Sequence, residues 1–95
     1  MKKEKLYLVI SSSGSWDDYF ESVVFATKDR EYAEKYVEKL DRLIEKTRDM
    51  LEPYTEIGLL GYSHIKEEYY DSWQYIRWEQ VRNLNKPFIR ETELR

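Results

Sequence analysis

Short apolar runs, each bounded by polar or turn-forming segments, predict three β-strands along the chain. Lys5–Ile10 is apolar at nearly every position, which is typical of a strand in the middle of a sheet. Ser22–Ala26 predicts a second strand, antiparallel to the first. Ser11–Ser15 and then Trp16–Glu21 predict an irregular loop between them. Phe88–Leu94 would place alternate residues on the two faces of a third strand. The segment carries several charges, which is typical of a half-exposed edge strand.

The hydrophobic period lengthens after Thr27. Apolar residues recur at steps of three and four positions between Lys28 and Glu52, with charged residues at most positions between them. This stripe predicts an amphipathic helix over Lys28–Glu52. Thr27 is a favourable N-cap for this helix, and Pro53 ends it.

A second helix is predicted after the glycine-containing connector Glu52–Ser63. Ser63 can cap a helix over His64–Asn83, and apolar residues lie on two sides of that helix. A helix that is apolar on both sides is normally covered on both sides, so one face is expected against a second subunit. A β-strand over Trp73–Val81 is the alternative, because its tyrosine and tryptophans also suit a strand.

These elements predict an α+β fold in the order β-β-α-α-β. The expected architecture is a small sandwich, in which two helices pack on a three-stranded, largely antiparallel sheet. A length of 95 residues suits one domain, so residues 1–95 are expected to form a single α+β domain. No membrane contact and a cytoplasmic location are expected, because no apolar run approaches about 18 residues and Leu6–Ile10 is too short for a secretory signal.

The composition excludes several classes of chemistry. A chain without cysteine has no disulfides, cysteine zinc sites, iron–sulfur ligation or thiol nucleophile, and its one histidine, His64, cannot form a multi-histidine metal site. Glycine-rich phosphate loops and nucleophile elbows are also missing. The 19 acidic and 16 basic residues give a net charge of -3, which argues against binding to a nucleic-acid polymer. No catalytic residue, metal or cofactor is therefore assigned.

Polar residues of the first loop are the candidates for contacting a phosphate. Their hydroxyl and N–H groups follow a strand, as in phosphate-binding loops. The loop has only one glycine and carries Asp17 and Asp18, so a solvated polar hairpin loop is the simpler interpretation. Acidic residues elsewhere, such as Glu67, Glu68 and Asp71, are interpreted as solvated surface. The candidate phosphate contacts are Ser11, Ser12, Ser13 and Ser15.

Aromatic residues make up 16% of the chain, which is more than a core of this size can easily enclose. One group lies in the first loop, and another lies in the segment Tyr69–Trp78 with arginines beside it. Exposed rings serve protein interfaces or stack on nucleotide bases, and arginine pairs with phosphate. Packing in the core is the third alternative. The candidate binding residues are Trp16, Tyr19, Phe20, Tyr70, Tyr75, Trp78, Arg77 and Arg82.

Two stretches of the chain resemble short uncharacterised accessory proteins of tailed phages and bacterial mobile elements. The first stretch contains K-L-Y-L-V-I-S-S-S-G-S, W-D-D-Y-F-E-S and V-F-A-T-K, and the helix after it contains A-E-K-Y-V-E-K-L. The second is S-W-Q-Y-I-R-W-E-Q-V-R-N-L-N with P-F-I-R-E-T-E-L-R. The resemblance implies action by binding, either to inhibit a host protein or to sequester a signalling nucleotide of host immunity.

The first functional hypothesis is a non-enzymatic binding protein, a phage anti-defence factor that inhibits a host protein through the aromatic surface. One alternative is a sponge that sequesters a signalling (cyclic) nucleotide, or a small phosphodiester-acting enzyme that uses the serines with Arg77 or Arg82. Another is a structural or housekeeping module whose aromatic residues are all core. Self-association into a homodimer or higher oligomer is expected, in the host cytoplasm if the chain is phage-encoded.

Overall fold

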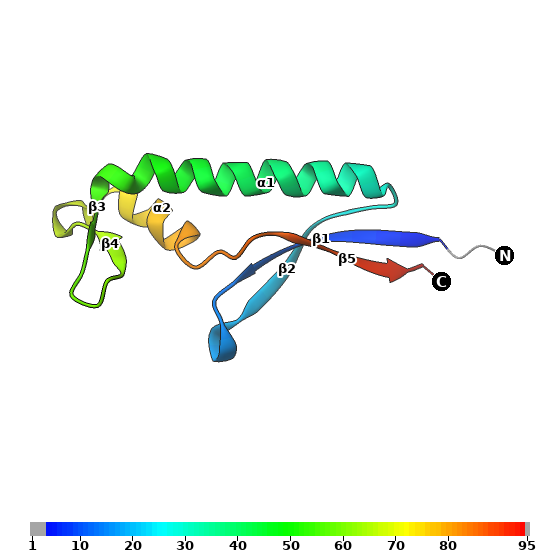
Figure 1. The fold of residues 1–95 in the computed structure, drawn as a ribbon, viewed down its shortest axis with the longest axis horizontal. Helices are drawn as coiled ribbons and strands as arrows, with labels where there is room; N and C mark the ends of the chain where they lie inside the picture. The colour runs from blue at the N-terminus through cyan, green and yellow to red at the C-terminus, as the bar shows by residue number, and fades with distance from the viewer. Residues whose placement is uncertain (1–3, 95) are drawn as a thin grey trace. The chain divides into compact units, whose positions relative to one another are not determined.

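A computed structural model describes residues 4–94 and divides the chain into two compact units. Unit 1 combines the residues up to Arg42 with those from Leu84 onward, and unit 2 is the continuous segment Leu43–Asn83. The long helix α1 (Arg30–Leu51) contributes residues to both units (Figure 1). The α+β class is confirmed, whereas the expectation of one domain over residues 1–95 stays a prediction.

Unit 1 contains the predicted three-stranded antiparallel sheet. Its strands are β1 (Lys5–Ser13), β2 (Phe20–Thr27) and β5 (Phe88–Glu93), in the order β2-β1-β5. The first strand is central, and the charged last strand is at an edge, as their patterns predict. Val9 of β1 lies opposite Phe25 of β2 on one side and Ile89 of β5 on the other.

The first two strands are longer than predicted, because three of the serines pair instead of forming a loop. Ser11 lies opposite Ser22, and the pairing continues to Ser13 and Phe20. Ser12 is buried, and its main-chain oxygen and hydroxyl accept hydrogen bonds from the main-chain N–H (2.9 Å) and side-chain amide (3.2 Å) of Asn85. Besides its pairing with β2, this polar run is therefore bonded to a residue more than 70 positions away in the sequence.

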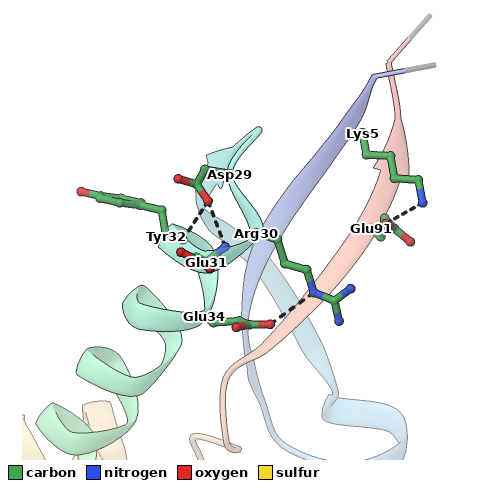
Figure 2. Close-up of polar contacts among 7 residues, drawn as sticks. All are labelled: Lys5, Asp29, Arg30, Glu31, Tyr32, Glu34 and Glu91. Carbon is green, nitrogen blue, oxygen red and sulfur yellow. Dashed lines mark hydrogen bonds and ion pairs between the residues drawn. The ribbon is translucent and has the colours of Figure 1, made fainter. Parts of the chain in front are cut away.

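Helix α1 confirms the predicted long amphipathic helix. Its N-terminus is capped by Asp29, whose Oδ1 accepts hydrogen bonds from the N–H groups of Glu31 (3.0 Å) and Tyr32 (3.4 Å) (Figure 2). The predicted cap, Thr27, lies two residues too early, and its hydroxyl instead accepts a bond from the Asp29 N–H. After Leu51, a 3₁₀ turn over Glu52–Tyr54 follows the helix.

The helix side of the sheet supplies part of the unit 1 core. Phe25 of β2 stacks on Tyr36 of α1, with ring centroids 4.5 Å apart, and contacts Tyr32 at 5.4 Å. Val9 and Ala33 are completely buried. Because Val9 and Phe25 are paired residues on one face of the sheet, the first half of α1 covers that face.

Unit 2 differs most from the sequence prediction. Residues Thr55–Ile57 (β3) and Ser63–Ile65 (β4) form an antiparallel two-stranded sheet where a connector and the start of a helix were expected. Helix α2 covers only Trp73–Val81, after a 3₁₀ turn over Glu67–Tyr69. The predicted helix over His64–Asn83 is therefore wrong in its first half, and the strand alternative over Trp73–Val81 is wrong. The element order is β-β-α-β-β-α-β.

The core of unit 2 explains why β4 replaces the predicted helical turn. Ile65 is almost completely buried, as is Leu51 at the end of α1, and the N–H of Lys66 donates to the Tyr54 carbonyl. The ring of Tyr54 contacts Tyr69 edge-on at 5.0 Å, with Trp73 at 6.0 Å. These contacts join the hairpin to the segment that leads into α2. Such contacts between separate segments cannot be predicted from the local periodicity of the sequence.

Candidate functional site

The turn between β1 and β2, residues 14–19, is a tightly bonded structure that we call the Trp16 turn. The N–H of Ser15 donates to Asp18 Oδ1 at 2.9 Å, and the N–H of Asp18 donates back to the Ser15 carbonyl at 3.3 Å. Gly14 has a φ of 74°, and a Cβ there would lie 2.4 Å from the Asp18 carbonyl oxygen. Only glycine fits this position, so the turn has one specific conformation.

Trp16 is held out of the protein by this turn. It is 94% exposed, and its φ of 54° is in the left-handed region that a bulky side chain rarely adopts. A strained residue persists only where its surroundings enforce it, and such residues cluster at functional positions. The structure thus brings together the predicted candidates Trp16, Tyr19 and Phe20, all of which are exposed.

A charged clamp next to the Trp16 turn was not predicted from the sequence. The guanidinium of Arg90 on β5 donates two hydrogen bonds to the Glu21 carboxylate on β2, at 2.8 and 3.0 Å. The Tyr19 hydroxyl donates a third at 2.7 Å. The bonds from Arg90 and Tyr19 hold the pKa of Glu21 below its ordinary value. The clamp joins the two edge strands of the sheet and fixes Tyr19 at the base of the turn.

The turn between β3 and β4 displays a second apolar group, which we call the Leu59 turn (residues 57–62). Leu59 is fully exposed, and the other three large side chains are at least 75% exposed: Ile57, Leu60 and Tyr62. The turn is closed by hydrogen bonds from the Gly58 N–H to the Tyr62 carbonyl (2.9 Å) and from the Gly61 N–H to the Gly58 carbonyl (3.0 Å). A shallow apolar hollow lies at the tip, lined by Gly58, Leu59, Leu60, Tyr62 and His64.

The Leu59 turn lies in the segment Glu52–Ser63, for which the sequence predicts only a connector. The available signal was a pair of leucines between two glycines, Gly58 and Gly61, in a segment with no helical period. Glycines that punctuate a short apolar run are typical of a hairpin turn. An apolar pair at the turn itself, where polar residues are usual, was the feature that pointed to a displayed surface.

Acidic residues lie along the β3–β4 hairpin and directly after it. A second hollow is lined by Glu56 of β3 and by Lys66, Glu67 and Glu68 after β4. The Nδ1 atom of His64, which lines the apolar hollow, lies 4.0 Å from a carboxylate oxygen of Glu56, so the two hollows adjoin. In residues 4–94, no group of three or more histidine or acidic side chains is arranged to hold a metal ion.

The remaining predicted binding residues lie on α2 or beside its ends in unit 2. Tyr70 and Tyr75 are exposed, with ring centroids 5.5 Å apart, and Trp78 is half-buried. Arg77 lies 3.4 Å from the Gln80 side-chain oxygen, and Arg82 lies 3.6 Å from Glu79. Both arginines therefore interact with neighbours on their own segment.

The candidate phosphate contacts lie in unit 1. Ser11, Ser12 and Ser13 are strand residues whose backbone pairs with β2, and only Ser15 lies in a turn. Their hydroxyls therefore do not line a loop of the kind that cradles phosphate. The arginines that the nucleotide hypothesis combines with these serines belong to the other unit.

Comparison of the chain with family models, curated proteins and solved structures found no match. Among the described helices, none is long and apolar enough to cross a membrane. Each unit therefore offers one candidate surface, the Trp16 turn in unit 1 and the Leu59 turn in unit 2.

Proposed function

We propose that this chain is a non-enzymatic protein-binding module that docks on its target through the Leu59 turn. The observation that carries the proposal is the near-complete exposure of four large apolar side chains on one closed turn. Contiguous apolar surface on a folded domain is typical of a site that a partner covers. Docking would remove these side chains from water, which is the main favourable contribution in most protein associations.

The Trp16 turn supports the same function independently. Tryptophan is among the residues most enriched in interface hot spots, and a preformed turn loses little conformational freedom on binding. Backbone strain at Trp16 opposes folding, so a function that needs the exposed ring accounts for its presence.

A protein target is better supported than a nucleotide. The backbone of Ser11–Ser13 pairs within the sheet and does not form a loop around a phosphate, and Arg77 and Arg82 interact with neighbouring side chains. The apolar character of the Leu59 turn offers little to a charged ligand.

The biological role follows from the sequence resemblance and is part of the proposal. We propose that the target is a host protein, met in the host cytoplasm and inhibited by the bound module as an anti-defence factor. We also propose self-association through the side of α2 that carries Trp73 and Ile76, which are one turn apart and are both exposed.

The test is affinity capture from bacterial lysate, quantified by mass spectrometry, with three versions of the chain. The double variant Leu59→Ser/Leu60→Ser removes the tip, and Leu43→Ser is the matched control because Leu43 is an exposed leucine on α1 (61%). We expect one protein to be captured by the wild type and the control and lost with the double variant. Equal capture by all three, with circular dichroism showing intact folds, would refute docking through the Leu59 turn.

A further inference from the structure

The charge around the Leu59 turn is strongly one-sided. Residues 49–71, which contain the whole hairpin, carry six acidic residues and a single base, Lys66. Three of the acids, Glu56, Glu67 and Glu68, line the second hollow, which approaches the apolar hollow of the tip where Glu56 meets His64, and we call them the acidic rim. The tip itself carries no charged residue between Ile57 and Tyr62.

Among residues 4–94, the acidic rim has fewer ion pairs than several acids of unit 1. In unit 1, Glu4 pairs with Lys28 at 2.9 Å, Glu91 with Lys5 at 3.2 Å (Figure 2), and Glu21 with Arg90. Within residues 4–94, neither Glu67 nor Glu68 forms an ion pair. In the described part of the chain, Glu56 has one ion-pair contact, the 4.0 Å approach to His64.

We infer that the partner is a protein surface with an apolar pocket bordered by lysine and arginine, so that the Leu59 turn enters the pocket and the acidic rim faces the basic border. This inference rests on the proposed function and names the chemistry of the partner. Unpaired carboxylates around an apolar centre form the arrangement of many interfaces, in which the centre supplies affinity and the charged border supplies selectivity and association rate.

A membrane surface is the other apolar environment that an exposed hairpin tip could enter. Biological membranes carry negative surface charge from anionic lipids, which repels carboxylates at close range. Glu56 lies next to His64, and Glu67 and Glu68 directly follow β4, so insertion of the hairpin would bring these carboxylates toward the lipid headgroups. The charge distribution therefore favours a basic protein over a lipid bilayer.

The test uses three synthetic amphipathic helical peptides as probes. All share one leucine-rich face, which is bordered by lysine in the first, glutamine in the second and glutamate in the third. Binding is measured by fluorescence anisotropy with a neutral dye. At an ionic strength of about 0.02 M, we expect the lysine peptide to bind about tenfold more tightly than the glutamine peptide, and the glutamate peptide to bind most weakly. The lysine preference should shrink as salt is added.

Variants separate the roles of the rim and the tip. Glu56→Gln/Glu67→Gln/Glu68→Gln should abolish the lysine preference, whereas the control Glu31→Gln/Glu38→Gln/Glu45→Gln, on exposed positions of α1, should retain it. Leu59→Ser/Leu60→Ser should lose binding to every peptide. Circular dichroism confirms that each variant is folded.

Each contrary outcome has a distinct meaning. Equal affinity for the lysine and glutamine peptides, with binding still lost in Leu59→Ser/Leu60→Ser, overturns the basic partner and leaves the proposed function standing. Lysine-peptide binding that survives Leu59→Ser/Leu60→Ser is charge attraction alone and overturns docking of the tip. No binding of the lysine peptide at about 1 mM also overturns the inference.

Lipid vesicles provide the last arm of the test. Phosphatidylcholine vesicles, with and without about one fifth phosphatidylglycerol, are mixed with the protein and floated on a density gradient. We expect the protein to stay out of the vesicle fraction in both cases. Co-flotation that depends on Leu59 and Leu60 would overturn the protein partner in favour of a membrane.

Discussion

The Trp16 turn and the Leu59 turn both expose large side chains to solvent, but their backbones are held in different ways. In the Trp16 turn, hydrogen bonds between Ser15 and Asp18 and a strained backbone direct one ring outward. The Leu59 turn has only the short strands β3 and β4 beneath it and relies on a glycine with a φ of 81° at Gly61. A rigid turn presents one side chain accurately, whereas a short hairpin presents several with more freedom to adapt to a partner.

The largest expected effect distinguishes the two turns by their glycines. Gly14→Ala places a Cβ against the Asp18 carbonyl and keeps a positive φ, so we expect a loss of about 3 kcal/mol of unfolding free energy. Gly61→Ala also keeps a positive φ, but no atom lies within 4 Å of the added Cβ. A loss of about 1 kcal/mol is expected there. Urea unfolding followed by circular dichroism measures the unfolding free energy of both variants. Equal losses in Gly14→Ala and Gly61→Ala would contradict the difference in rigidity between the two turns.

A smaller effect of opposite sign is expected at Trp16. Trp16→Gly removes the strain of the left-handed backbone, which stabilises the folded state, and it makes the unfolded chain more flexible, which opposes folding. The first effect is the larger, so the unfolding free energy should rise by about 0.5–1 kcal/mol. Trp16→Ala keeps the positive φ and is the matched control, for which we expect little change. If both variants destabilise the protein in urea titrations, the ring contributes to folding and is not held outward for binding.

The smallest expected effect concerns the Glu21–Arg90 clamp, which is exposed and therefore weak. Because the folded pKa of Glu21 is lowered, its contribution is present above the ordinary glutamate pKa and is lost as pH falls through the folded value. The difference in unfolding free energy between wild type and Glu21→Gln should therefore narrow as the solution is acidified. A difference that is constant from neutral pH into the acid range would show that the ion pair does not stabilise the fold.

Long periodic elements could be predicted from the sequence, whereas short ones could not. The central position of β1, the edge position of β5 and the α1 helix all follow from apolar patterns of six or more residues. The strands β3 and β4 have three residues each, which is too few to show a period. Their pairing depends on burial of Ile65, and tertiary burial has no local signature.

The same limit applies to the candidate site. Trp16, Tyr19 and Phe20 stood out because large rings in a polar loop are unusual, and the structure exposes all three. Leu59 and Leu60 did not stand out, because leucine is normally a core residue and only a structure shows where it lies. The partners of Ser12 and Glu21 lie about 70 positions away, beyond the reach of any local motif.

The position of β5 after unit 2 in the chain has a consequence for synthesis on the ribosome. Unit 2 is one continuous segment that ends at Asn83, before β5. The sheet of unit 1 cannot be completed until the last strand, Phe88–Glu93, has left the exit tunnel. Until then β1 has an unpaired edge at Val9 and Ile10, two of the most buried side chains in the protein. A nascent or truncated chain that stops before Phe88 is therefore the form most exposed to aggregation and proteolysis.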